Sequence, residues 1–149
     1  MRVAVGYIPP NAKWYVAEIV EEITIKGEAR NVVHVNAILV RADSPEEALE
    51  RAQELGRQCE VTYENVSGNK VAIHFRGLHA LGVIHDNLEH GTELFYSEDI
   101  GMPEEEVAKL ITPKEQLGVF RPRTPSAAPD YVCKEISEAL RMTGKADSK

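Results

Sequence analysis

The sequence predicts an α+β fold: an antiparallel sheet of four to five strands in ββαβββ order, with one helix packed on a face and further helices at the C-terminal end. Three observations lead to it. Two long segments near the start alternate apolar and polar side chains, a strongly signalled helix follows them, and a second pair of strand-like segments follows the helix. Because adjacent hairpins favour antiparallel pairing, we expect the helix between them to cover one face.

The first hairpin joins residues 14–26 to residues 31–41 through a turn that begins at Gly27. The first segment alternates apolar and polar positions, which is typical of a strand. The returning strand is apolar on both faces: one face carries Val33, Val35, Ala37 and Leu39, and the other carries Val32, Ile38 and Val40 around His34 and Asn36. We therefore expect at least part of that second face to be covered.

The helix after this hairpin has the clearest signals in the chain. Ser44 suits the N-cap, Pro45 the first helical position and Glu47 the capping-box position. An apolar stripe follows at helical spacing. Gly56 suits the left-handed residue that terminates many helices, so we expect the helix to end there.

Residues 59–65 and 71–78 predict a second hairpin, because the turn between them holds glycine and asparagine. Gly77 and Gly82 then predict a bulge or loop. A short strand is expected at residues 92–96.

The remainder of the sequence predicts a short helix, a linker and a last helix. Residues 103–111 open with proline and three glutamates, which favours a short helix. Prolines cluster between Phe120 and Pro129, and Asp130 can cap a last helix that ends at Gly144. The predicted organisation is an N-terminal extension (1–12), a single α+β domain (13–112), a proline-containing linker (113–129) and a C-terminal helix with a tail (130–149).

Composition restricts the classes of function. The chain has 149 residues, of which 43% are apolar and 28% charged, enough for one core. Its longest apolar run is too short for a transmembrane helix, and 17 basic against 24 acidic residues argue against nucleic acid as a partner. The N-terminus lacks the pattern of a signal peptide, so we expect a cytoplasmic protein with Cys59 and Cys133 as reduced thiols.

Four short motifs follow one another along the chain: Lys13-Trp14-Tyr15-Val16-Ala17, Ala42-Asp43-Ser44-Pro45-Glu46-Glu47-Ala48, Phe75-Arg76-Gly77-Leu78 and Gly91-Thr92-Glu93-Leu94. In this order they resemble a small bacterial family of unknown function, with a Trp-Tyr-x-Ala first strand and a Gly-Thr-Glu-Leu last strand. The resemblance covers residues 13–112. It implies a bacterial origin and one compact domain, and it supplies no activity, cofactor or catalytic residue.

One helix of three turns cannot cover both faces of such a sheet. Apolar side chains remain for the other face: Trp14, Val16, Val20, Ile38 and Val40. We expect this face to be closed by the C-terminal helices or by another subunit, and the second alternative predicts a homo-oligomer, specifically a dimer. The acidic helix residues Glu46, Glu47, Glu50 and Glu54 also favour contact with a basic protein, although such faces commonly serve only solubility.

No catalytic set is recognisable, because neither cysteine has a neighbouring histidine and no phosphate loop is present. The leading hypothesis is therefore a non-catalytic module that self-associates or binds another protein, without a cofactor. The alternative is a metal-binding protein or small metal-dependent enzyme that uses His74, His79, His85 and His90. Their spacing matches no known metal motif, so separate surface histidines are the simpler interpretation.

Overall fold

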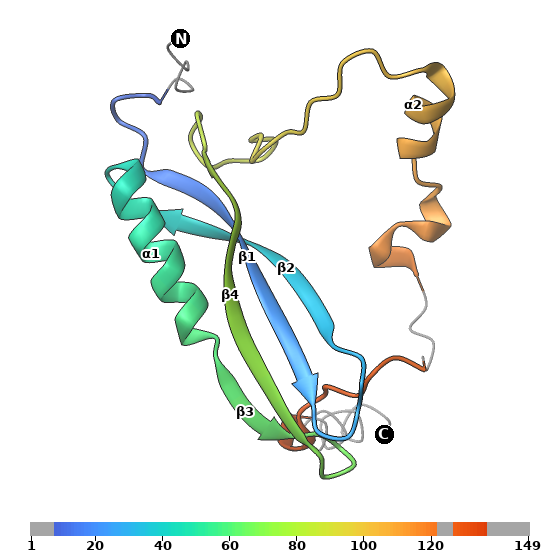
Figure 1. The fold of residues 1–149 in the computed structure, drawn as a ribbon. Coiled ribbons are helices and arrows are strands. Elements are labelled where there is room, and N and C mark those ends of the chain that lie inside the picture. The colour runs from blue at the N-terminus through green and yellow to red at the C-terminus, as the bar shows by residue number, and fades with distance from the viewer. Residues whose placement is uncertain (1–7, 122–126, 137–149) are drawn as a thin grey trace, which may run out of the picture. The chain divides into compact units, whose positions relative to one another are not determined.

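The computed structural model describes residues 8–121 and 127–136. Its elements are β1 (Trp14–Ile25), β2 (Val32–Arg41), α1 (Pro45–Gln58), β3 (Val61–Glu64), β4 (Lys70–Val83), α2 (Glu104–Leu110) and the 3₁₀ turns η1 (Lys114–Gln116) and η2 (Gly118–Phe120). The four strands form one antiparallel sheet in the order β2-β1-β4-β3, and α1 lies on one of its faces (Figure 1). The predicted α+β class is confirmed.

The two predicted hairpins both form. Gly27 turns the chain after β1 with a φ of 87°, and Gly68 turns it between β3 and β4 with a φ of 82°; glycine adopts such left-handed values without a steric cost. In the first hairpin Tyr15 lies opposite Val40, and Ala17 lies opposite Ile38. Residues directly opposite each other share a face, so this register decides which side chains meet the helix.

Strand β4 runs through the region where a bulge or loop is expected. Its pairing with β1 shifts twice: the partners of Glu18 and Ile19 are Ala80 and Leu78, which leaves His79 as an extra residue. A second shift, between the partners of Val20 and Glu21, leaves Arg76 as an extra residue, next to Gly77 with its φ of 136°. The bulges are confirmed, and the strand continues beyond them to Val83.

Helix α1 begins as its sequence predicts, because the Ser44 side chain accepts a hydrogen bond from the Glu47 amide at 3.1 Å. The prediction that it ends at Gly56 is wrong: the helix continues to Gln58. Gly56 is buried inside the last turn, where the ring of Phe75 on β4 occupies the space of a side chain. The glycine therefore permits a close contact between helix and sheet.

The apolar core consists of two clusters on the α1 face of the sheet. One gathers buried residues of β1, β2 and α1: Tyr15, Ala17, Val40, Ala42, Ala48 and Ala52. The other holds Ile23, Ile25 and Val71 near the far end of β1. Between them along β1 lies the buried carboxylate of Glu21, which accepts a hydrogen bond of 3.0 Å from the Asn36 side chain.

The short strand predicted at residues 92–96 does not form. Gly91 adopts a φ of 88°, and the Thr92 hydroxyl donates to the Asn87 carbonyl at 2.6 Å while accepting from the Glu89 amide at 2.9 Å. These local hydrogen bonds hold the segment in a turn instead of a ladder. The sheet of the described chain therefore has four strands.

The described chain divides into two compact units: residues 8–95 with 129–136, and residues 96–121 with 127–128. The first holds the sheet and α1. The second holds α2, η1 and η2, and the predicted helix at 103–111 appears in it as α2. Among the described residues, no helix is both long and apolar enough to cross a membrane.

Candidate functional site

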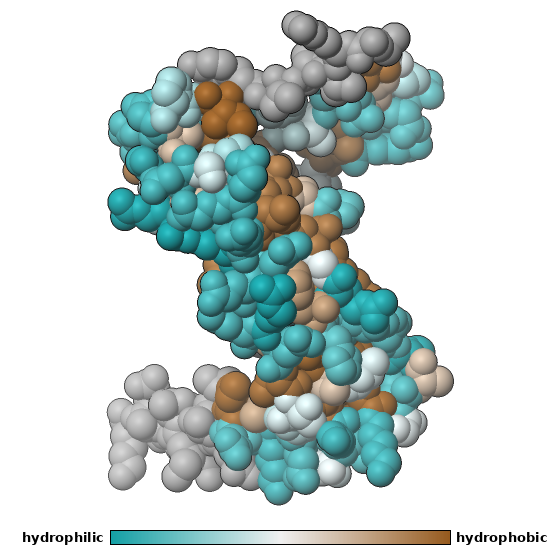
Figure 2. All heavy atoms as spheres, turned by 60° about the vertical axis from the view of Figure 1, so that its left-hand side comes forward, coloured by the Kyte–Doolittle hydropathy of each residue, from teal (hydrophilic) through white to brown (hydrophobic). Residues whose placement is uncertain are grey.

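The face of the sheet opposite α1 carries an apolar stripe. Because Tyr15 and Ala17 point into the helix-side cluster, the alternate residues of β1, namely Trp14, Val16 and Val20, belong to the opposite face. On β2 they are joined there by Val33, Val35 and Leu39, which are 52%, 52% and 47% exposed. We call this opposite side of the sheet the open face. Figure 2 is turned toward the α1 side of the sheet, where brown apolar residues also lie between teal hydrophilic ones.

The five residues predicted as an interface do not share one face. Trp14, Val16 and Val20 lie on the open face, but Val40 is buried in the helix-side cluster and Ile38 packs against it. The prediction was wrong for these two because the sequence shows that both faces of β2 are apolar without showing which one α1 covers. The open face instead holds the other stripe of β2, Val33, Val35 and Leu39.

Strand β2 is also an edge of the sheet. It pairs with β1 on one side, and no strand of the described chain pairs with its other side. Between Val32 and Val40 it contains no proline, lysine or other formally charged residue. Proteins commonly protect exposed edges with such residues, so β2 is a long edge without that protection.

The four histidines of the metal hypothesis are not brought together. His74 lies 3.9 Å from a carboxylate oxygen of Glu60, and His79 lies 3.9 Å from one of Glu18. His85 and His90 follow the end of β4. Throughout residues 8–121 and 127–136, no three histidine, cysteine or acidic side chains are grouped as metal ligands would be.

The two bulges in β4 place polar side chains beside carboxylates of β1. Beside the His79 contact, an Arg76 guanidinium nitrogen lies 3.6 Å from a Glu22 oxygen. Glu22 also accepts a 2.6 Å hydrogen bond from the Asn31 side chain. These partially exposed pairs contribute little stability individually, and we interpret them as polar cover for the part of the open face next to the apolar stripe.

Cys59, at the end of α1, lacks the surroundings of a nucleophile. Its thiol donates to the Leu55 carbonyl at 3.3 Å. Burial and the neighbouring Glu21 carboxylate raise the pKa of the Cys59 thiol, which favours the unreactive protonated form. His34 makes an edge-to-face contact with the ring of Tyr131 at 5.4 Å between ring centres.

The acidic surface of α1 forms as predicted from the sequence. Glu46, Glu50 and Glu54 are exposed, and Glu47 pairs with Arg51 at 2.6 Å one turn along the helix. Contact with a basic protein stays a prediction.

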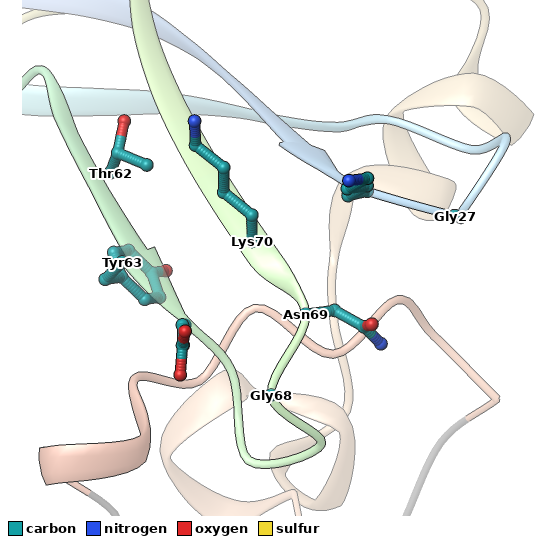
Figure 3. A pocket seen from close by; sticks show the side chains of 8 residues that line it. Gly27, Thr62, Tyr63, Gly68, Asn69 and Lys70 are labelled. Atoms are coloured by element: carbon teal, nitrogen blue, oxygen red, sulfur yellow. The ribbon is translucent and has the colours of Figure 1, made fainter.

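A hollow of about 720 Å³ opens at the end of the sheet where both hairpin turns lie (Figure 3). Lys26 and Gly27 contribute from the first turn, and the other lining residues come from the second hairpin: Thr62, Tyr63, Glu64, Gly68, Asn69 and Lys70. All of them except Tyr63 are exposed. The hollow therefore lacks a buried polar group that would fix the orientation of a ligand.

Beside this hollow, the C-terminal segment 129–133 docks on the sheet. Asn65 is 2% exposed, and its side-chain amide donates to the Asp130 carbonyl at 3.0 Å. The Tyr63 hydroxyl donates to the Tyr131 carbonyl, and Asn65 and Cys133 form an antiparallel bridge. This contact was not predicted from the sequence. The alternation of Pro129, Tyr131 and Cys133 was the available signal, because an extended strand places such positions on one side.

The predicted last helix does not start at Asp130. The Asp130 carboxylate accepts a hydrogen bond of 3.2 Å from the Val132 amide, and helical residues begin only at 134. The remainder of that prediction, from 137 to Gly144, lies outside the described residues.

These features define a small α+β domain with one covered sheet face, one open face and, in its described part, no grouped metal ligands. The chain belongs to the family described as Domain of unknown function (DUF4288), whose model matches residues 14–96. This confirms the resemblance to a family of unknown function. Comparison with curated proteins and with solved structures gave no match.

Proposed function

We propose that this protein is a non-catalytic module that self-associates as a dimer through the edge and open face of β2. The observation that carries the proposal is the coincidence of two features on one strand. Val33, Val35 and Leu39 present half-exposed apolar side chains, and the same strand leaves its backbone edge unpaired in the described chain. Contact through this strand would remove both from water.

The strand is suited to pair with a second copy of itself. In an antiparallel pair related by a two-fold axis through Asn36, Val33 would face Leu39 of the partner subunit, and Val35 would face Ala37 of the partner subunit. Every cross-strand pair of the stripe would then be apolar. A pair centred on Ala37 would place Val33 against a charged Arg41, so the axis at Asn36 is the favoured register.

The cysteines fit a reducing compartment for this function. Cys59 and Cys133 are both free thiols. Because the cytoplasm keeps thiols reduced, we propose that the module acts there.

The test is the molar mass of the full chain in solution, measured by light scattering after size exclusion. We expect a dimer for the natural sequence and a monomer for Val35→Lys, since a charge on the stripe would be buried without a partner. The matched control is Val61→Lys, because Val61 is 49% exposed and lies on β3, the opposite edge of the sheet. Circular dichroism checks that each variant is folded.

A monomer of the natural chain at concentrations of about 100 µM and above would overturn the proposal, since a functional interface should hold tighter than that. A dimer that Val61→Lys dissociates and Val35→Lys leaves intact would move the interface to the other edge.

A further inference from the structure

The docked C-terminal segment has the features of a bound peptide. Its residues alternate between partially buried and exposed: Pro129, Tyr131 and Cys133 are partially buried, whereas Asp130 and Val132 are exposed. This two-residue period is that of an extended strand seated on a surface. The segment therefore lies along the sheet with every second side chain turned toward it, and it forms one antiparallel bridge with the sheet, between Asn65 and Cys133.

The sheet contacts this strand through two different kinds of interaction. Asn65 and Tyr63 donate to the backbone carbonyls of Asp130 and Tyr131, contacts that any peptide sequence could accept. Tyr131 supplies the selective contact, because its ring packs against the second core cluster and meets the edge of His34. Backbone hydrogen bonds combined with a pocket for one side chain are how sheets recognise extended peptides.

The side chain of Asn65 is held in position by a contact within the β3–β4 turn that does not involve the docked segment. Its side-chain oxygen accepts a 2.8 Å hydrogen bond from the Asn69 amide, which closes the β3–β4 turn. That bond fixes the side chain so that its nitrogen is directed at the Asp130 carbonyl. With the segment in place, Asn65 is 2% exposed, and the Asp130 carbonyl satisfies a side-chain donor that would be costly to leave unpaired at this burial.

The residues that form the site and the segment that fills it come from different parts of the chain. His34, Tyr63, Asn65 and the apolar cluster of Ile23, Ile25 and Val71 all lie within residues 14–96, which the family model covers. The docked segment follows much later, after the separate unit that begins at Tyr96. In this chain the site thus lies within the matched domain, and its occupant comes from a segment outside that domain.

We propose that this surface is a peptide-binding site of the domain, and that residues 129–133 occupy it in cis. The partner it fits is an extended segment of another protein that places an aromatic side chain in the position of Tyr131 and offers two successive backbone carbonyls to Asn65 and Tyr63. The intramolecular segment masks the site, and a partner binds by displacing it. This proposal is independent of the β2 interface.

Because the internal segment competes with any added peptide, the test must compare the natural chain with one whose segment is weakened. A tethered segment acts at an effective concentration on the order of millimolar, so the natural chain should bind a matching peptide only weakly. The probe is a fluorescein-labelled peptide with the sequence of residues 127–136 and serine in place of Cys133, and binding is followed by fluorescence polarisation. A second peptide with alanine in place of Tyr131 is the control.

We expect Tyr131→Ala in the full chain to bind the probe at least about tenfold tighter than the natural chain, because the weakened internal segment no longer competes. Adding Tyr63→Phe should reduce that affinity, since it removes only the hydroxyl that donates to the peptide carbonyl. The alanine peptide should bind neither protein. A folded Tyr131→Ala chain that binds no better than the natural chain would overturn the proposal.

A second measurement needs no variant. Cys133 is partially buried in the docked segment, so its alkylation by iodoacetamide reports release. An excess of the unlabelled peptide should speed alkylation of Cys133 in the natural chain, and the alanine peptide should not. A rate that neither peptide changes would show that the segment is not displaceable, and an equal increase with both would show that the aromatic side chain is not recognised; either result would overturn the proposal.

Discussion

Substituting Gly56 by alanine tests the contact between α1 and β4. In an exposed helix interior this change stabilises a protein by roughly 1 kcal/mol. Here a Cβ at Gly56 would overlap the ring of Phe75, and overpacking of this kind costs about 1–3 kcal/mol. The steric cost exceeds the gain in helix propensity, so we expect a net loss of about 1 kcal/mol in the free energy of unfolding.

The ring of Phe75 also provides the control. In a Phe75→Leu background the shorter side chain leaves room for the Cβ, and Gly56→Ala should stabilise by about 0.5–1 kcal/mol. The double-mutant cycle then gives a coupling of about 2 kcal/mol between the two sites. Urea unfolding followed by circular dichroism measures all four free energies. If Gly56→Ala stabilises both backgrounds equally, the glycine is not required for close packing between α1 and β4.

Three further predictions concern single side chains. Ser44→Ala should lower the free energy of unfolding by about 1 kcal/mol, because it removes the N-cap of α1, and no change in urea unfolding would contradict that role. Burial, followed by the nearby Cys133, Tyr131 and Asp130, raises the pKa of the Tyr63 phenol. Its stabilising contribution should therefore persist below the ordinary tyrosine pKa of about 10 and be lost as the pH rises through the higher folded value, a loss that is absent from Tyr63→Phe in pH-dependent unfolding. Iodoacetamide should alkylate Cys59 more slowly at pH 8 in the folded chain than in urea, because its thiol pKa is raised; equal rates measured by mass spectrometry would rule that out.

Local signals in the sequence predict the elements well. The alternation of β1 and β2, the cap at Ser44 and the glycine turn at Gly68 each depend on residues close together in the chain, and each forms as expected. The predicted end of α1 was wrong because Gly56 leaves space for the ring of Phe75, which comes from a later strand. A helix-terminating glycine and a glycine that admits a neighbouring ring look alike in sequence.

The candidate sites were harder to predict because they depend on pairing. Which stripe of β2 is open follows from its register with β1 and from the position of α1, neither of which the alternation contains. The docked segment depends on Asn65, a residue whose sequence context indicates only a turn. The sequence around Asp130 predicts a helix cap. In the structure its carbonyl instead accepts a hydrogen bond from Asn65, and its carboxylate closes a short turn.

The two bulges in β4 have a consequence for how this strand can change in length. On the α1 side, successive residues are two apart up to Phe75, then three apart to Leu78 and again to Leu81. Each bulge absorbs one extra residue, so the side chains beyond it keep their faces although the odd-even numbering changes. Deleting Arg76 alone would leave Phe75, Gly77 and Leu78 in regular register with Glu21, Val20 and Ile19, and the apolar side chains beyond would still face the helix. Deleting His79 alone would remove the other bulge in the same way. This strand should therefore tolerate the loss of one residue where the residue lost is the extra one of a bulge.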